Sequence, residues 1–133
     1  MADLVPFLMF QKGEAAEAMS FYVSLFPGDA VLTDQRYGAE GPGPEGTVVM
    51  AEFTVAGQRV RCSDSWVTHE FDFTPSVSLF VTCDSKEQLA RVYDLLLEDR
   101  EALMPLDDYG FGPFGWVNDR YGVSWQLSAP AAT

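Results

Sequence analysis

The stretch "GWVNDRYGVSWQL", residues 115–127, shows how the sheet of this protein is built. It is typical of a strand, a tight polar turn and a second strand. In the second strand, alternate residues are apolar, and these are Val123, Trp125 and Leu127. The residues between and after them are Ser124, Gln126 and Ser128. A period of two places the two sets on opposite faces of a sheet. The apolar face needs a covering layer, and the polar face either meets bulk water or lines a binding site.

The composition is that of one globular domain. The chain has 133 residues, of which 47% are hydrophobic and 14% aromatic, so it can form a core of its own. No apolar run approaches the roughly 20 residues that a membrane span needs, and the N-terminus lacks the ordered regions of a secretory signal. Cys62 and Cys83 each lie among strand-forming residues, which favours buried free thiols in a reducing, cytoplasmic compartment over a disulfide.

The charge excludes two classes of partner. The formal net charge is −12, with eight Lys and Arg residues and no basic stretch. Nucleic acids and anionic membranes bind positively charged surfaces, so neither is expected as a partner. The negative charge could attract a cationic ligand.

The order of elements indicates a diverged duplication. Each half is predicted to hold a strand, a helix and three further strands, and a Gly-rich loop precedes its last hairpin. The predicted helices are residues 13–27 and 84–99. The predicted strands are residues 5–10, 30–38, 47–55, 58–65, 76–83 and 102–106, followed by the hairpin quoted above. Ala56-Gly57 is predicted as a two-residue turn, and residues 66–75 as a linker.

Two segments point to a known family. "PFLMFQKGEAAEAMSFYVSLFPG" (6–28) and "FGWVNDRYGVSWQL" (114–127) resemble the PhnB-like branch of the vicinal-oxygen-chelate superfamily. This superfamily includes glyoxalase I, extradiol dioxygenases and bleomycin-resistance proteins. The resemblance implies an α+β domain over residues 1–133, with two βαβββ modules at about 1–66 and 67–130. The modules form a cup-shaped mixed sheet with helices on its outer face, and members are usually homodimers.

Some relatives have a demethylubiquinone methyltransferase label, but no glycine-rich cofactor loop follows the first predicted strand, so no cofactor is expected. Catalytic members of the superfamily hold a metal ion with His, Glu or Gln side chains on the first, fourth, fifth and eighth strands. In this chain, the resemblance places Phe7, Arg61, Ser76 and Gln126 at those positions. Divalent transition metals prefer imidazole, carboxylate or thiolate donors. Because Gln126 alone could serve as a donor, no metal site is expected.

Strand alternation and the turn at Ala56-Gly57 predict which side chains line the cup. The turn register places Glu52 opposite Arg61 on the cup side, and Phe53 opposite Val60 on the helix side. Val77, Leu79 and Val81 are expected to face the helices. Tyr109, Phe111 and Phe114 are expected near the mouth of the cup, together with one predicted lining residue, Trp116. The predicted ligand-binding residues are Phe7, Met9, Met50, Glu52, Arg61, Ser76, Phe80, Trp116 and Gln126.

These residues predict a protein that binds a small organic molecule without a metal. In the alternative structural interpretation, the side chains fill the cup themselves or form a dimer contact. A second functional hypothesis is an enzyme of the lyase, isomerase or dioxygenase type, with or without a metal, in which Glu52 is a base and Arg61 binds an anion. A drug-sequestering resistance protein and a domain with a vestigial site are the remaining alternatives. The sequence leaves open whether the protein is an enzyme.

Overall fold

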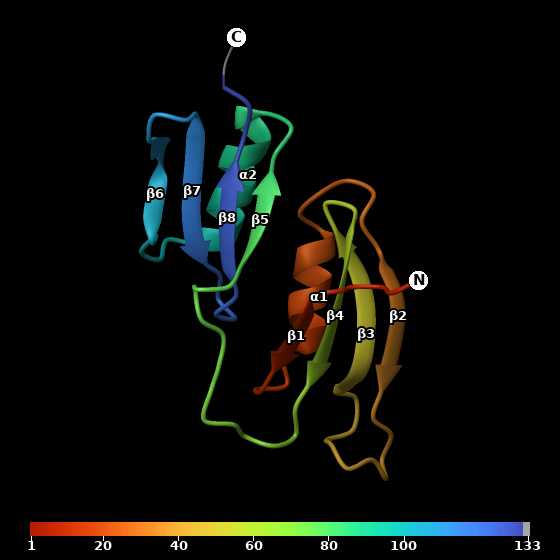
Figure 1. Cartoon of the computed structure of the whole chain (residues 1–133). Helices are drawn as coiled ribbons and strands as arrows, with labels where there is room; N and C mark the ends of the chain where they lie inside the picture. The colour runs from red at the N-terminus through yellow and green to blue at the C-terminus, as the bar shows by residue number, and fades with distance from the viewer. Residues whose placement is uncertain (132–133) are drawn as a thin grey trace. The chain divides into compact units, whose positions relative to one another are not determined.

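The chain folds as two compact βαβββ units, which are described separately. The structure is a computed structural model and describes residues 1–131. The first unit spans Met1–Glu70, and the second begins at Phe71. Each unit has one helix and a four-stranded mixed sheet (Figure 1), which confirms the predicted α+β fold of two βαβββ modules.

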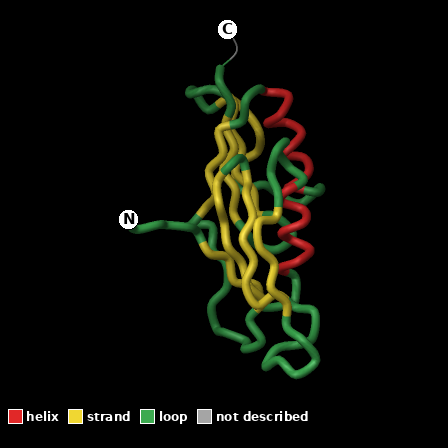
Figure 2. The backbone as a smooth tube through the Cα atoms, turned by 90° about the vertical axis from the view of Figure 1, so that its right-hand side faces the viewer, coloured by secondary structure: helices red, strands yellow, loops and turns green. Residues whose placement is uncertain are grey.

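The first unit contains β1 (Phe7–Phe10), α1 (Ala15–Val23), β2 (Val31–Arg36), β3 (Val48–Val55) and β4 (Gln58–Asp64). Its strand order is β1-β4-β3-β2. The first strand runs parallel to β4, and the other neighbours are antiparallel. The buried residues of α1 include Met19 and Tyr22, and the ring of Tyr22 stacks on Phe53 of β3. This helix therefore covers one face of the sheet (Figure 2).

The observed α1 is shorter than the predicted helix over residues 13–27. It ends at Val23, and the hydroxyl of Ser24 donates to the carbonyl of Phe21 over 2.5 Å. The N–H of Leu25 donates to the carbonyl of Tyr22, which tightens the last turn. Leu25 and Phe26 are nevertheless buried, so their apolar spacing reflects burial beyond the end of the helix.

The turn at Ala56-Gly57 joins β3 and β4 as predicted. Both residues have positive φ angles, 49° and 80°, as a type I′ hairpin turn requires. Their two N–H groups donate to the carboxylate of Asp29 at 2.7 and 3.0 Å. The turn fixes the predicted register, in which Glu52 pairs with Arg61 and Phe53 pairs with Val60.

The second unit contains β5 (Ser78–Thr82), α2 (Lys86–Leu97), β6 (Met104–Asp108), β7 (Pro113–Asn118) and β8 (Ser124–Ser128). Its strand order is β5-β8-β7-β6, with β5 parallel to β8. Ser85 caps α2 by accepting a hydrogen bond from the N–H of Gln88. The helix packs closely on β7, where a Cβ added at Gly115 would lie 2.7 Å from the ring of Tyr93.

The turn between β7 and β8 is built around the buried carboxylate of Asp119. This side chain accepts hydrogen bonds from the N–H groups of Tyr121 and Val123 at 2.8 and 3.1 Å. It also accepts the indole N–H of Trp125 at 2.9 Å, while Gly122 supplies a positive φ of 89°. The sequence motif at residues 119–125 thus fixes both the turn and the large buried side chain that follows it.

The faces of the strands follow the predicted alternation, with one exception. Trp125 and Leu127 are fully buried and Val81 is nearly so. Val77, predicted to face the helix, is 74% exposed because it precedes β5. Its N–H donates to the carbonyl of Thr74 in a turn. Within residues 1–131, no helix is long and apolar enough to cross a membrane.

Candidate functional site

Each sheet has one face that packs on its helix and a second face, here called the helix-free face. In the first unit, Ala51, Phe53, Val60 and Cys62 are buried toward α1. By alternation, the helix-free face carries five of the predicted ligand-binding residues, which are Phe7, Met9, Met50, Glu52 and Arg61.

An ion pair lies at the centre of the helix-free face of the first sheet. The Nε atom of Arg61 lies 2.8 Å from Oε1 of Glu52, and Nη1 of Arg59 lies 3.6 Å from the same oxygen. The side chain of Glu52 is 14% exposed and that of Arg61 is 45% exposed. Phe7 is the register partner of Arg61 on β1 and is half-exposed. This face therefore combines a carboxylate–guanidinium ion pair with an apolar surface.

A chain of hydrogen bonds crosses the helix-free face of the second sheet. The indole Nε1–H of Trp116 donates to Oγ of Ser124 at 2.8 Å. Ser124 is buried, and its Oγ lies 2.7 Å from Oγ of Ser78. The Nε2 atom of Gln126 lies 3.3 Å from the same Ser78 oxygen. Three strands thus contribute to one polar network.

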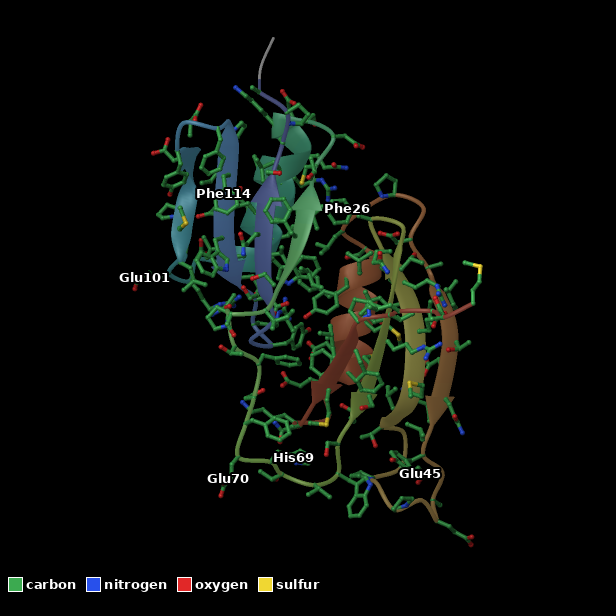
Figure 3. All side chains as sticks on the ribbon, in the orientation of Figure 1. Phe26, Glu45, His69, Glu70, Glu101 and Phe114 are labelled. Carbon is green, nitrogen blue, oxygen red and sulfur yellow. The ribbon has the colours of Figure 1, made fainter. Side chains whose placement is uncertain are left out.

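An aromatic cluster lies on the same side of the second sheet. Its buried member is Phe114 on β7 (Figure 3), whose ring lies 5.6 Å from that of Phe111 and 6.2 Å from that of Tyr109. Phe80 lies 6.3 Å from Phe114 and is 60% exposed, and Phe111 is also exposed. The exposed rings of this cluster surround the buried ring of Phe114. Together they form a surface suited to apolar or planar groups.

The comparisons with known proteins agree with this fold. The family model for 3-demethylubiquinone-9 3-methyltransferase matches residues 2–128. The chain belongs to this family. A PhnB protein from Bacillus cereus is 49% identical over 97% of this chain and 100% of its own, with a TM-score of 0.92. A protein from Pseudomonas aeruginosa is 25% identical over 99% and 100% of the two chains, with a TM-score of 0.83. No curated protein matches the chain significantly.

More distant solved structures share the fold of this chain. A glyoxylase/bleomycin resistance protein/dioxygenase domain from Frankia is 12% identical over 97% of this chain and 91% of that one, with a TM-score of 0.65. The fosfomycin resistance protein FosX from Listeria monocytogenes is 10% identical over 98% and 94%, with a TM-score of 0.63. At these identities the likeness concerns the fold.

The four positions that the sequence resemblance assigned to metal ligands do not carry side chains that fit a metal ion. Phe7 has no donor atom, Arg61 is a cation and Gln126 is a neutral amide. Ser76 lies in the turn before β5, where its Oγ is 3.4 Å from Oγ of Thr74. Within the described residues, 1–131, no group of three His, Cys, Asp or Glu side chains could hold a metal ion. These donors do not form the coordination sphere that such ions prefer.

The segment after β1 also differs from a typical cofactor loop. Residues 11–14 join β1 to α1 with one glycine, Gly13. The carboxylate of Asp64 accepts the N–H of Ala15 at the start of α1 and the N–H of Val48. The start of this helix is therefore closed by a buried side chain of the protein itself.

The cysteines are buried free thiols, as predicted. Burial, together with the charge of nearby carboxylates, raises the pKa of Cys62 to about 12 and the pKa of Cys83 to about 11. Nucleophilic cysteines need a lowered pKa and access to a substrate. Neither thiol has these properties.

One groove lies elsewhere in the second unit. It has a volume of about 320 Å³ and lies between α2 and the neighbouring strands β6 and β7. It is lined by Lys86, Leu89, Ala90, Leu106, Asp107, Asp108 and Pro113. None of the predicted ligand-binding residues lines this groove.

The sequence prediction placed Ser78 and Ser124 on the cup side but did not include them among the ligand-binding residues. Their alternation with apolar neighbours placed both on the polar face, but nothing in the sequence marked them as partners of Trp116. Ser124 and Ser78 are 46 residues apart and meet because β5 pairs with β8 in register. Of the predicted residues on this sheet, Phe80, Trp116 and Gln126 lie together across three strands, whereas Ser76 lies outside the strand.

Proposed function

We propose that this protein binds a small organic molecule on the helix-free faces of its two sheets, without a metal ion. In this proposal the two modules, at about residues 1–66 and 67–130, belong to one domain, and each contributes the helix-free face of its own sheet. Phe7, Met9, Met50, Glu52 and Arg61 contribute from the first sheet. Phe80, Trp116 and Gln126 contribute from the second sheet, and Ser76 contributes from the turn before β5.

The observation that carries the proposal is the composition of the second helix-free face. Phe80 is 60% exposed and Phe111 is 67% exposed, and the hydrogen-bonded Gln126 lies next to Phe80 in the register. Exposed rings beside a few fixed polar groups are the usual composition of a small-molecule site. A face that met only bulk water would gain nothing from exposed phenylalanines.

The first experiment compares two truncations by ligand-observed NMR with a set of small aromatic fragments. We expect Phe80→Ala to weaken fragment binding by about threefold to tenfold, because an aromatic contact is lost. Leu95→Ala is the matched control, since Leu95 is an exposed apolar residue on α2. The proposal would be contradicted if the fragments bound equally to the wild type and to Phe80→Ala, or if no fragment bound to the wild type.

Two further properties belong to this proposal. We place the protein in the cytoplasm, because both of its cysteines are buried free thiols. We also propose a homodimer, because each four-stranded sheet has two edge strands that further pairing would cover.

A further inference from the structure

The donor and the acceptor of each hydrogen bond in the network on the second sheet can be assigned, starting from Trp116. An indole N–H can only donate, so Ser124 Oγ accepts at the 2.8 Å contact. Ser124 is 2% exposed, and a hydroxyl proton buried to this degree needs an acceptor. Its remaining side-chain contact is Ser78 Oγ at 2.7 Å. Ser124 therefore donates to Ser78.

The same reasoning assigns the donor and the acceptor in the hydrogen bond between Ser78 and Gln126. Ser78 has a single hydroxyl proton, which is directed to the carbonyl of Pro75 at 3.4 Å. Toward Gln126, Ser78 therefore acts as an acceptor, and the amide group of Gln126 turns its Nε2 to it at 3.3 Å. The other end of the amide, Oε1, forms no hydrogen bond within the part of the chain that the structure describes.

The surroundings of Gln126 are aromatic on both sides. Phe80 on β5 and Trp116 on β7 are its register partners. A second acceptor on β7, Oδ1 of Asn118, is buried and has no hydrogen-bond partner among residues 1–131. Acceptors are thus in excess on this part of the face, between rings that suit an apolar or planar group.

From this arrangement we infer that Gln126 is a specificity-determining hydrogen-bond acceptor. The ligand class that it selects is an aromatic or apolar ring that carries an N–H or O–H donor. Ser78 is the positioning residue, because its occupied proton keeps the amide in one orientation. The inference rests on the proposed function, since it assumes that this face binds the ligand.

Two matched probe pairs test the requirement for a donor. Indole and 1-methylindole differ by the N–H group, and phenol and anisole differ by the O–H group. Binding is measured by titration in two-dimensional NMR, with the indole N–H signal of Trp116 and the side-chain amide signals of Gln126 as local reporters. We expect indole and phenol to bind about threefold to tenfold more tightly than their methylated partners, the range for one hydrogen bond.

Three variants separate the acceptor from its surroundings. In Gln126→Leu, the members of each pair should bind equally, because the acceptor is lost. In Ser78→Ala the amide is free to rotate, so the preference should also fall, with anisole gaining relative to phenol. Thr82→Ala is the control, since Thr82 is an exposed residue of β5 on the same face, and it should keep the wild-type preference.

The outcomes distinguish the inference from the proposed function. If all four probes shift the Trp116 and Gln126 signals with equal affinities, the face binds ligands but the acceptor role is wrong. If the preference persists unchanged in Gln126→Leu or Ser78→Ala, a different group selects the donor, and the inference is wrong. If none of the probes shifts these signals at millimolar concentration, the binding face itself is contradicted, and the inference with it.

Discussion

Asp119 shows how much a single residue contributes to the second sheet. Its buried carboxylate accepts two backbone N–H groups and the indole N–H of Trp125. In Asp119→Ala these buried donors lose their acceptor, so we expect the free energy of unfolding to fall by about 3 kcal/mol, as measured by urea denaturation. Asp72→Ala, at an exposed carboxylate that accepts the N–H of Phe73, should cost no more than about 0.5 kcal/mol. A similar cost for both variants would contradict this role.

For a single residue, the sequence predicts the face of the sheet on which it lies but not the atoms that it contacts. Alternation placed Gln126 opposite Trp125 and Leu127, and the fully buried Trp125 and Leu127 agree with this placement. The role of Asp119 was not predicted, because a turn aspartate has several local partners available to it. Its bond to Trp125 depends on the path of the chain through the turn, which a periodic pattern does not describe.

The turn of the β3–β4 hairpin can be made more or less stable by changes at its two central residues. Ala56 occupies a left-handed conformation with φ of 49°, which costs energy for a residue with a Cβ. Asparagine adopts this conformation more readily, so Ala56→Asn should raise the free energy of unfolding by about 0.5–1 kcal/mol. Gly57→Ala, at φ of 80°, should lower it by a similar amount. Thermal and urea unfolding of both variants measure the change, and a destabilised Ala56→Asn would contradict the expectation.

The ends of elements were predicted less well than their centres. The centre of β5 has the expected alternation, but the strand begins at Ser78, two residues later than predicted. The hydroxyl of Thr74 lies 3.5 Å from the N–H of Ser76, and its carbonyl accepts the N–H of Val77. These local bonds compete with strand pairing. Val77 therefore stays exposed although its side chain is apolar.

We expect the whole molecule to form a homodimer, because one edge of the first sheet is uncovered. All six residues of β2 are exposed, and β2 is an edge strand of its sheet. Uncovered edges attract further strands, and natural proteins usually protect them. We expect sedimentation velocity at micromolar concentration to show a species of twice the chain mass of 14.7 kDa. A single monomeric species across the accessible concentrations would contradict the dimer.

The alternation along β3, β4 and β8 has a consequence for how such a protein can evolve. Side chains that hold the domain together point toward the helices, and those proposed to meet the ligand point the other way. Under the proposed function, a substitution at Met50 or Gln126 therefore changes what the surface recognises while leaving the core largely intact. Selection for a new ligand and selection for stability then act on separate sets of codons. A lineage built on this fold can exchange the chemistry of its helix-free faces one residue at a time while the core that packs on the helices stays the same.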